Sequence, residues 1–182
     1  MHVPELLDDL ARLERRWQEL RVSTDSLRPG LDRTQVIASL ARSGVPAHAD
    51  LLTWFAWHDG TSELYWYAVP MSVGPLTLEQ ALEHREEYQP QDESDAAYPP
   101  SWLPILGGPS TDHIAMDADT GELLRVDPWD AEAPVRRSGH DLASAVKFFL
   151  LVLETVPLDY SSGQAQVRFG DLRAEFQASP LL

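Results

Sequence analysis

Cysteine is absent from this 182-residue chain, and lysine occurs once, at position 147. The first absence excludes disulfides, thiolate nucleophiles and metal sites with sulfur ligands. It is typical of a reducing compartment, so we expect a cytoplasmic protein. The scarcity of lysine excludes a phosphate-binding P-loop, which needs Gly-Lys-Ser/Thr after a strand, because the single lysine, Lys147, precedes Phe148.

Long apolar runs are also missing. The longest, residues 148–153 (FFLLVL), is far shorter than the roughly 20 residues that a membrane helix needs. The first 20 residues, MHVPELLDDLARLERRWQEL, are too acidic and too interrupted by charge for a signal peptide. We therefore expect no membrane partner.

Positive charge is scarce: 14 basic residues face 29 acidic ones, a formal net charge of −15. Such a chain repels nucleic-acid phosphates, whereas a basic protein is attracted and steered toward it. We expect a basic protein partner and no nucleic acid, although solubility is another reason for an acidic surface. Between positions 79 and 132 only Arg85 and Arg125 oppose these acids: Glu79, Glu83, Glu86, Glu87, Asp92, Glu93, Asp95, Asp112, Asp117, Asp119, Glu122, Asp127, Asp130 and Glu132.

The first third of the chain has helical periodicity. Apolar residues recur at spacings of three and four over residues 5–20, 33–42 and 47–58, which predicts three helices. Ile37 is expected among the inward residues of the second helix, and Gly44 is expected to end it.

The third helix ends in His58-Asp59-Gly60. This sequence is interpreted as a helix end, with Gly60 in the left-handed conformation just past it. Trp57 lies off the apolar stripe of this helix, so it is a candidate for an exposed aromatic anchor at an interface.

The pattern then changes to strands. Residues 64–69 (LYWYAV) predict a strand, Gly74-Pro75 a turn, and Thr77 with Gln80 a capping box that opens a helix reaching about Tyr88. The polar, proline-rich residues that follow, 89–101, predict a loop.

A β-meander and a buried helix complete the predicted core. Short strands are expected at residues 103–106, 113–116 and 122–126, and a strongly apolar helix capped near Asp141 covers residues 142–153. The tail carries weaker patterns, a strand at 166–169 and a helix at 172–177.

Together these patterns predict one α+β domain over residues 1–182. N-terminal helices precede a β-meander and a buried C-terminal helix, and the helices pack on a mainly antiparallel or mixed sheet. Residues 157–182 form a C-terminal extension.

Catalytic chemistry has little support in the residue pattern. No His-x3-His or His-Glu-x2-His pair occurs, and Asp117-x-Asp119-x-Gly121 lacks the glycine and glutamate of a calcium loop, so it is interpreted as a hairpin turn. We expect no catalytic residues, no metal and no cofactor. The alternative of another class is a metal-assisted hydrolase that uses His58, Asp59 and His113 or Asp117.

The order of several segments resembles the SUKH superfamily, the cell-wall-assembly-regulator (Smi/Knr-like) domains. Residues 46–60 (PAHADLLTWFAWHDG) resemble its proline-led helix of the type LPxxLxxFLxxHNG, and residues 74–82 (GPLTLEQAL) resemble its strand followed by an S/T-L-E-E-A helix. Residues 102–105 (WLPI) and 112–117 (DHIAMD) are similar to its W-x-P-I and G-D-x-x-x-x-D block, and residues 142–153 to its closing helix.

The resemblance covers about residues 40–155 and has two departures. Asp59 stands where asparagine is usual, and residues 108–112 replace the usual Gly-Asp pair. The resemblance implies a non-enzymatic α+β domain. Bacterial members are often immunity proteins that neutralise a cognate toxin, frequently a nuclease, and eukaryotic relatives are regulatory interaction modules.

The leading hypothesis is therefore an intracellular protein-binding domain, an immunity protein for a basic, nuclease-type toxin. The alternative is a regulatory or scaffolding protein without a toxin partner, and the oligomeric state is open. The candidate partner-binding residues combine acids with tryptophans: Trp57, Asp59, Glu86, Glu87, Asp92, Glu93, Asp95, Asp127, Trp129, Asp130 and Glu132.

Overall fold

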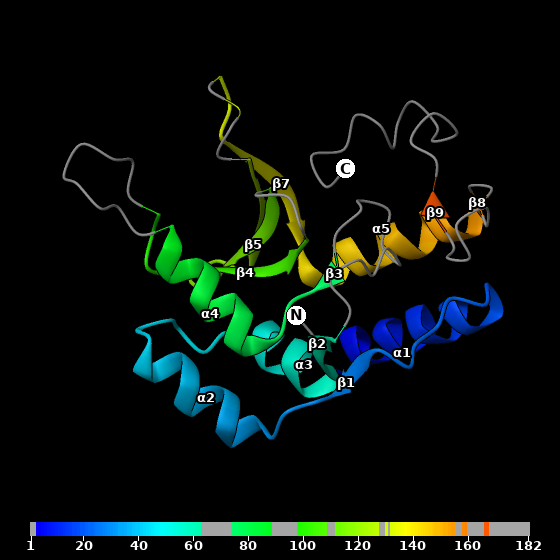
Figure 1. Cartoon of the computed structure of the whole chain (residues 1–182), viewed down its shortest axis with the longest axis horizontal. Coiled ribbons are helices and arrows are strands. Elements are labelled where there is room, and N and C mark those ends of the chain that lie inside the picture. The colour runs from blue at the N-terminus through cyan, green and yellow to red at the C-terminus, as the bar shows by residue number, and fades with distance from the viewer. Residues whose placement is uncertain are drawn as a thin grey trace.

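The computed structural model describes residues 3–62, 74–88, 98–108, 112–127, 130, 132–155, 158–159 and 166–167. Figure 1 shows the elements in chain order. The helices are α1 (Val3–Glu19), α2 (Arg33–Arg42), α3 (Ala49–Trp57), α4 (Leu78–Glu87) and α5 (Leu142–Thr155). The strands are β1 (Leu27–Pro29), β2 (His58–Thr61), β3 (Gly74–Pro75), β4 (Trp102–Gly107), β5 (His113–Asp117), β6 (Glu122–Val126), β7 (Val135–Asp141), β8 (Leu158–Asp159) and β9 (Gln166–Val167).

The main sheet is antiparallel and has the strand order β3-β4-β5-β6-β7. Strands β4, β5 and β6 follow one another in both chain and space, which confirms the predicted meander. Strands β1 and β2 pair separately, as do β8 and β9. The α+β class and the order of helices, meander and closing helix are therefore as the sequence predicts.

The two faces of the sheet carry different clusters. Ile114 and Met116 of β5 join the main hydrophobic core, whereas Ala115 between them joins a small cluster with Tyr98 and Leu124. This alternation follows from the two-residue period of a strand. Helix α4 packs on β4, and α5 packs on β7.

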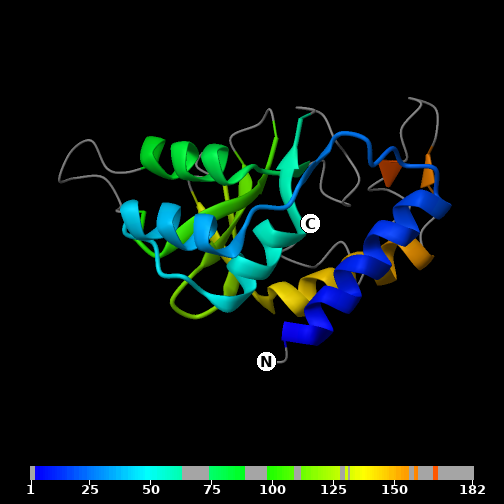
Figure 2. The ribbon, with the colours of Figure 1, turned by 90° about the horizontal axis from the view of Figure 1, so that it is seen from below.

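Helix α1 lies beside α5 in both views (Figures 1 and 2). Its apolar stripe is fully buried and ends at Trp17. At the same interface, Arg16 donates to the backbone carbonyl of Leu153 at 3.0 Å, and Lys147 lies 3.6 Å from the carboxylate of Asp9. The single lysine is thus used in joining these two helices.

The predicted helix ends are confirmed in three places. Thr77 and Gln80 form a reciprocal capping box at the start of α4. Ser144 and Asp141 exchange hydrogen bonds at the start of α5, 2.8 Å from N to Oδ1 and 3.0 Å from N to Oγ. Gly44, at φ +68°, ends α2.

Other expectations are corrected. Ile37 is 40% exposed, because α2 buries only the stripe through Val36 and Leu40. Gly74-Pro75 is not a turn but strand β3, whose residues pair with the end of β4. Residues 135–141, for which no element is predicted, form the edge strand β7.

The end of the third helix also differs from expectation. Helix α3 stops at Trp57, and His58, Asp59 and Gly60 belong to strand β2. Gly60 does have a positive φ of +68°, but its role is a close approach: a Cβ there would lie 2.3 Å from the Thr77 nitrogen. Only glycine fits such a contact, so β2 runs directly against the segment that enters α4.

Several predicted elements lie outside the described residues. These are the strand at 64–69, the helix at 172–177 and most of the loop at 89–101. The predicted strand at 166–169 is present in part as β9.

Candidate protein-binding surface

Helix α4 carries a row of exposed glutamates that we call the α4 stripe: Glu79, Glu83, Glu86 and Glu87. Their spacing of four, three and one residues places them on one side of the helix. The opposite side is buried through Leu78 and Ala81, which join the main core. The helix is therefore anchored by its apolar face and presents carboxylates to solvent.

Glu79 favours the helix dipole in the first turn of α4, but helix stability does not explain the other three glutamates of the α4 stripe. Within the part of the chain that the structure describes, none of the four glutamates forms an ion pair with a basic side chain. Glu83 has like charges four residues away on both sides, and each such pair costs about 0.2–0.5 kcal/mol. Glu86 and Glu87 also oppose the helix dipole, because they lie in the last turn.

The arginine of α4 lies on the buried side. Arg85 is 8% exposed, and its Nε and Nη2 atoms donate to the backbone carbonyl of Pro100 at 3.2 and 2.9 Å. Arg85 thus joins α4 to the segment that enters β4, and the outer face is left to the acids.

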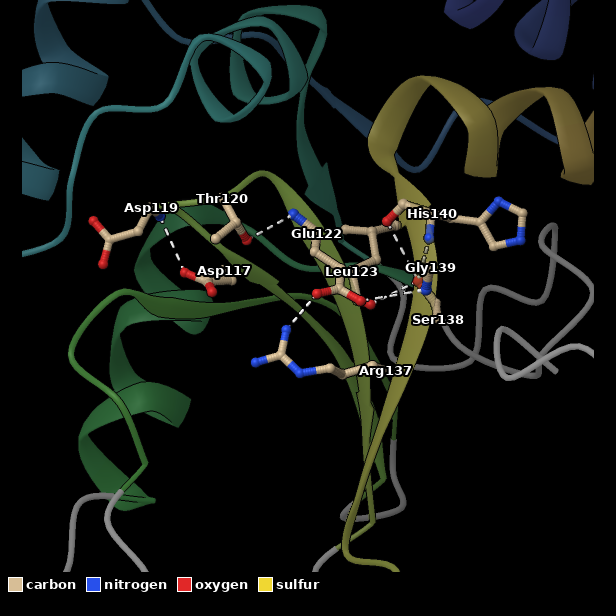
Figure 3. Close-up of polar contacts among 9 residues, drawn as sticks. All are labelled: Asp117, Asp119, Thr120, Glu122, Leu123, Arg137, Ser138, Gly139 and His140. Carbon is tan, nitrogen blue, oxygen red and sulfur yellow. Dashed lines mark hydrogen bonds and ion pairs between the residues drawn. The ribbon is translucent and has the colours of Figure 1, made fainter.

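Acids of the sheet are used differently, because they take part in local hydrogen bonds. Figure 3 shows Glu122 of β6 bonded to Arg137 and to the Gly139 N–H of β7, beside Ser138, whose hydroxyl donates to the Leu123 carbonyl at 2.6 Å. These contacts fasten β7, a strand with few apolar residues, to β6.

Asp130, which follows β6 in the chain, also takes part in local hydrogen bonds. It accepts from the backbone N–H groups of Ala133 and Glu132 and from Arg136, and these bonds hold its pKa below the usual range. Asp112 pairs with Arg125 at 3.4 Å. These carboxylates shape the hairpin, so they offer a partner less than the α4 stripe does.

An aromatic cluster brings the end of α4 to the end of the meander. The ring of Tyr88, the C-cap of α4, stacks on His113 at 4.7 Å and on Tyr98 at 5.7 Å, and the Tyr98 hydroxyl lies 3.3 Å from His113 Nε2. His113 opens β5 and pairs with Val126, the last residue of β6. The stripe end at Glu87 and the acids after β6 therefore share one end of the sheet.

The structure places the acidic candidates of α4 and of the segment after β6 in two settings. Glu86, Glu87 and Glu132 are exposed, whereas Asp127 and Asp130 are half-buried. Four of the predicted binding residues lie outside the described part of the chain: Asp92, Glu93, Asp95 and Trp129.

Trp57 is held in an aromatic cluster and does not project as an anchor. Its ring lies 5.8 Å from Trp17, 5.4 Å from Trp54 and 4.6 Å from the ring of His58. It is half-buried, and its indole N–H is sealed from solvent without a hydrogen-bond partner. The turn from α3 into β2 folds this residue back against α1, which helical periodicity alone does not indicate.

Asp59 is only 7% exposed and accepts a 2.8 Å hydrogen bond from the backbone N–H of Leu78. Asp59 and Thr77 together accept from the N–H groups of Leu78 and Gln80, two of the first-turn donors that have no partner within the helix. Asp59 therefore sets the position of α4 and, through it, of the α4 stripe.

The residues of the hydrolase hypothesis have separate surroundings. His58 faces the Arg28 carbonyl at 2.9 Å and Glu14 at 3.5 Å, whereas His113 lies in the tyrosine cluster. Asp117 turns back to accept from the Asp119 N–H at 3.1 Å, as in a hairpin turn. Among the residues with described positions, no three His, Asp or Glu side chains form a group suited to a metal ion.

Glu79 and Glu83 are members of the surface that the sequence-based list of binding residues omits. Their signal is present in the sequence, because glutamates at i, i+4, i+7 and i+8 share a helical face. Counting acids over a long segment does not reveal that face, and the capping box at Thr77 fixes the register needed to see it.

Comparison of the sequence with models of known protein families finds no match. No curated protein has significant sequence similarity to the chain. In the residues that the structure describes, no helix combines the length and the apolar character needed to cross a membrane.

Proposed function

We propose that this chain is a non-enzymatic protein-binding domain of the SUKH type that holds a basic partner protein through the α4 stripe. The observation that carries the proposal is the row of four exposed glutamates without basic partners among the described residues, on a helix whose opposite face is buried. A row of like charges costs folding free energy, and a basic partner removes that cost on binding.

The charge of the whole chain supports the same proposal. A net charge of −15 accelerates the approach of a basic protein by about 10- to 1000-fold, with strong dependence on salt. A nuclease-type toxin is basic because it binds phosphates, so an immunity protein that neutralises such a toxin is the specific form we propose.

The test is a comparison of two charge-reversal variants as baits in a lysate of the native cell. The first replaces Glu83, Glu86 and Glu87 by lysine. The control replaces Glu5, Asp8 and Asp25, which are exposed and distant in sequence from α4, and it changes the net charge equally.

We expect a basic protein that the wild-type chain and the control capture and that the α4 variant loses. If both variants lose it equally, only net charge matters and the α4 stripe is not the binding surface. If neither variant loses any partner, the proposed surface is wrong.

A second measurement separates the immunity protein from a regulatory scaffold. The captured partner is expressed alone and then with this chain, and growth of the host is followed. An immunity protein restores growth that the partner arrests, and the α4 variant restores it less. A partner that is harmless when expressed alone favours the scaffold.

A further inference from the structure

A groove between α2 and α4 adjoins the α4 stripe. Figures 1 and 2 both show the two helices side by side, and α2 packs on α3 while α4 packs on β4. The groove has a volume of about 380 Å³, which is in the range of small ligand sites. Its apolar part consists of Leu31, Leu78 and Leu82.

The two sides of this α2–α4 groove have opposite charges. Asp59 and Glu79 lie on the side of α4, and Arg42 lies on the side of α2 with Gln35 and Ser39. Arg42 is bound along its own helix, because its Nη2 donates to the Ser39 hydroxyl at 3.0 Å and its Nε to the Ala38 carbonyl at 3.3 Å.

Asp59 gives the groove a carboxylate at its base. Its Oδ1 accepts from the Leu78 N–H. Among the residues with described positions, the only partner of its Oδ2 is the Nε of Arg28 at 3.8 Å, which is longer than a hydrogen bond. The Arg28 side chain is 51% exposed, so water and competing cations reach it. Oδ2 therefore keeps the capacity to accept a hydrogen bond from a group that enters the groove.

We propose that the α2–α4 groove receives one long cationic side chain, arginine or lysine, from the basic partner. The methylene stem lies on Leu78 and Leu82, and the charged group reaches Asp59 and Glu79. Such side chains bury their stems on apolar surface while the charged end keeps polar contacts. Arg42 repels the cation from the opposite side and fixes its direction in the groove.

This inference rests on the proposed function, since it names the chemistry by which the basic partner is anchored. The α4 stripe and the groove share only Glu79. Glu83, Glu86 and Glu87 do not line the groove, so the two proposals fail separately. A partner whose binding needs the three stripe glutamates but tolerates Asp59→Asn keeps the proposed function and removes the groove.

The experiment is an NMR titration of the full chain with N-acetyl-L-arginine amide. We expect amide shift changes concentrated at Ser39, Leu78, Glu79 and Leu82. The matched probes are the amides of N-acetyl-norleucine, which has the stem without the charge, and N-acetyl-glutamate. Both are expected to bind more weakly, and equal shifts with norleucine would overturn the proposal.

Two variants test whether the carboxylates of Asp59 and Glu79 bind the arginine probe. Asp59→Asn keeps an oxygen for the Leu78 N–H and removes the negative charge, while Glu79→Gln removes the charge of an exposed residue. Each is expected to weaken binding of the arginine probe by about two- to fivefold. The control Glu5→Gln removes an exposed charge on α1, which does not line the groove, and should leave binding unchanged. Unaltered affinity in both groove variants would show that the arginine probe binds elsewhere.

Discussion

Helices α4 and α5 both begin with reciprocal hydrogen bonds, Thr77 with Gln80 and Asp141 with Ser144. Beyond the first turn they differ. Helix α5 buries eight of its 14 residues, whereas α4 buries three of ten and presents the α4 stripe. The two helices thus have similar N-terminal caps, but α5 packs into the core whereas α4 presents its outer face to solvent. The predictions below test this division.

The largest effect is expected from Phe149→Ala in α5. Phe149 is 1% exposed in the main core, so its loss leaves a cavity and should lower the free energy of unfolding by about 3–5 kcal/mol. The matched change in α4, Glu86→Ala, should alter it by less than about 0.5 kcal/mol. Urea denaturation measures both. Similar losses in the two helices would contradict the division.

A smaller effect is expected at the start of α4. Thr77→Ala removes the acceptor of the Gln80 N–H and should cost about 1 kcal/mol of unfolding free energy. Because the cap also fixes the orientation of the α4 stripe, partner binding should weaken too. Thr77→Ser, which keeps the hydroxyl, serves as the control, and denaturant unfolding measures the difference. A Thr77→Ala variant as stable as Thr77→Ser would show that the cap is dispensable.

Asp50, in the first turn of α3, contrasts with the exposed glutamates of α4 because its carboxylate is buried. Burial raises the pKa of Asp50, and the charge of Asp141 raises it further although His48 opposes the shift. An acid with a raised pKa in the folded state loses its stabilising contribution as the pH rises from its unfolded value of 3.8 through the folded pKa.

Asp50→Asn should therefore be more stable than the wild-type chain at neutral pH, and the difference should shrink toward pH 3. Chemical denaturation at several pH values measures this trend. The control is Ile37→Val, which changes an exposed residue without a titratable group, so its difference from the wild-type chain should not change with pH. A constant difference between Asp50→Asn and the wild-type chain across this range would contradict the assignment.

The smallest effect on stability, and the most specific, is expected from Glu83→Lys. The lysine gains opposite charges at Glu79 and Glu87 in place of two like-charge pairs. At the lower end of the range for exposed helix pairs, about 0.2 kcal/mol for each of the four changes, the free chain should become more stable by about 0.8 kcal/mol. Partner binding should weaken in the same variant. Thermal unfolding and a binding assay measure the two effects, and a variant that loses stability would show that the glutamates are needed for folding.

Much of the fold is predictable from the sequence because strong hydrophobic periodicity and helix-capping residues occur in the same segments. The stripe of α1 from Leu6 to Trp17, the capping box of α4 and the apolar run of α5 each specify an element without help from distant residues. Strands β4, β5 and β6 are short but strongly apolar, and turn residues such as Gly121 separate them.

Elements that depend on distant partners are not predictable in this way. Strand β7 contains polar residues, among them two arginines as well as Ser138 and Gly139. It forms because its backbone pairs with β6 and because Glu122 pairs with Arg137. Strand β1 includes Pro29 and exists only through pairing with β2. Neither has an alternating apolar pattern of its own.

The candidate site is likewise predictable from the sequence only in part. The excess of acid in the middle of the chain is visible in the sequence, and it predicts a basic partner. The sequence does not show that Asp130 and Glu122 are used inside the hairpin, or that Trp57 folds back onto Trp17. Those facts depend on which segments meet in space, whereas the glutamates of the α4 stripe are exposed and form no ion pair among the described residues.

The most direct test of the account is the association rate of the captured partner with the wild-type chain and with the variant in which Glu83, Glu86 and Glu87 are lysines. The rates are measured by stopped flow at about 0.01 M and 0.15 M ionic strength, where the screening length falls from about 30 Å to about 8 Å. We expect the wild-type rate to be at least about tenfold higher at low salt and to fall steeply with salt, and the variant to lose both properties. A variant that binds as fast as the Glu5, Asp8 and Asp25 control, with the same salt dependence, would contradict the assignment of binding to α4.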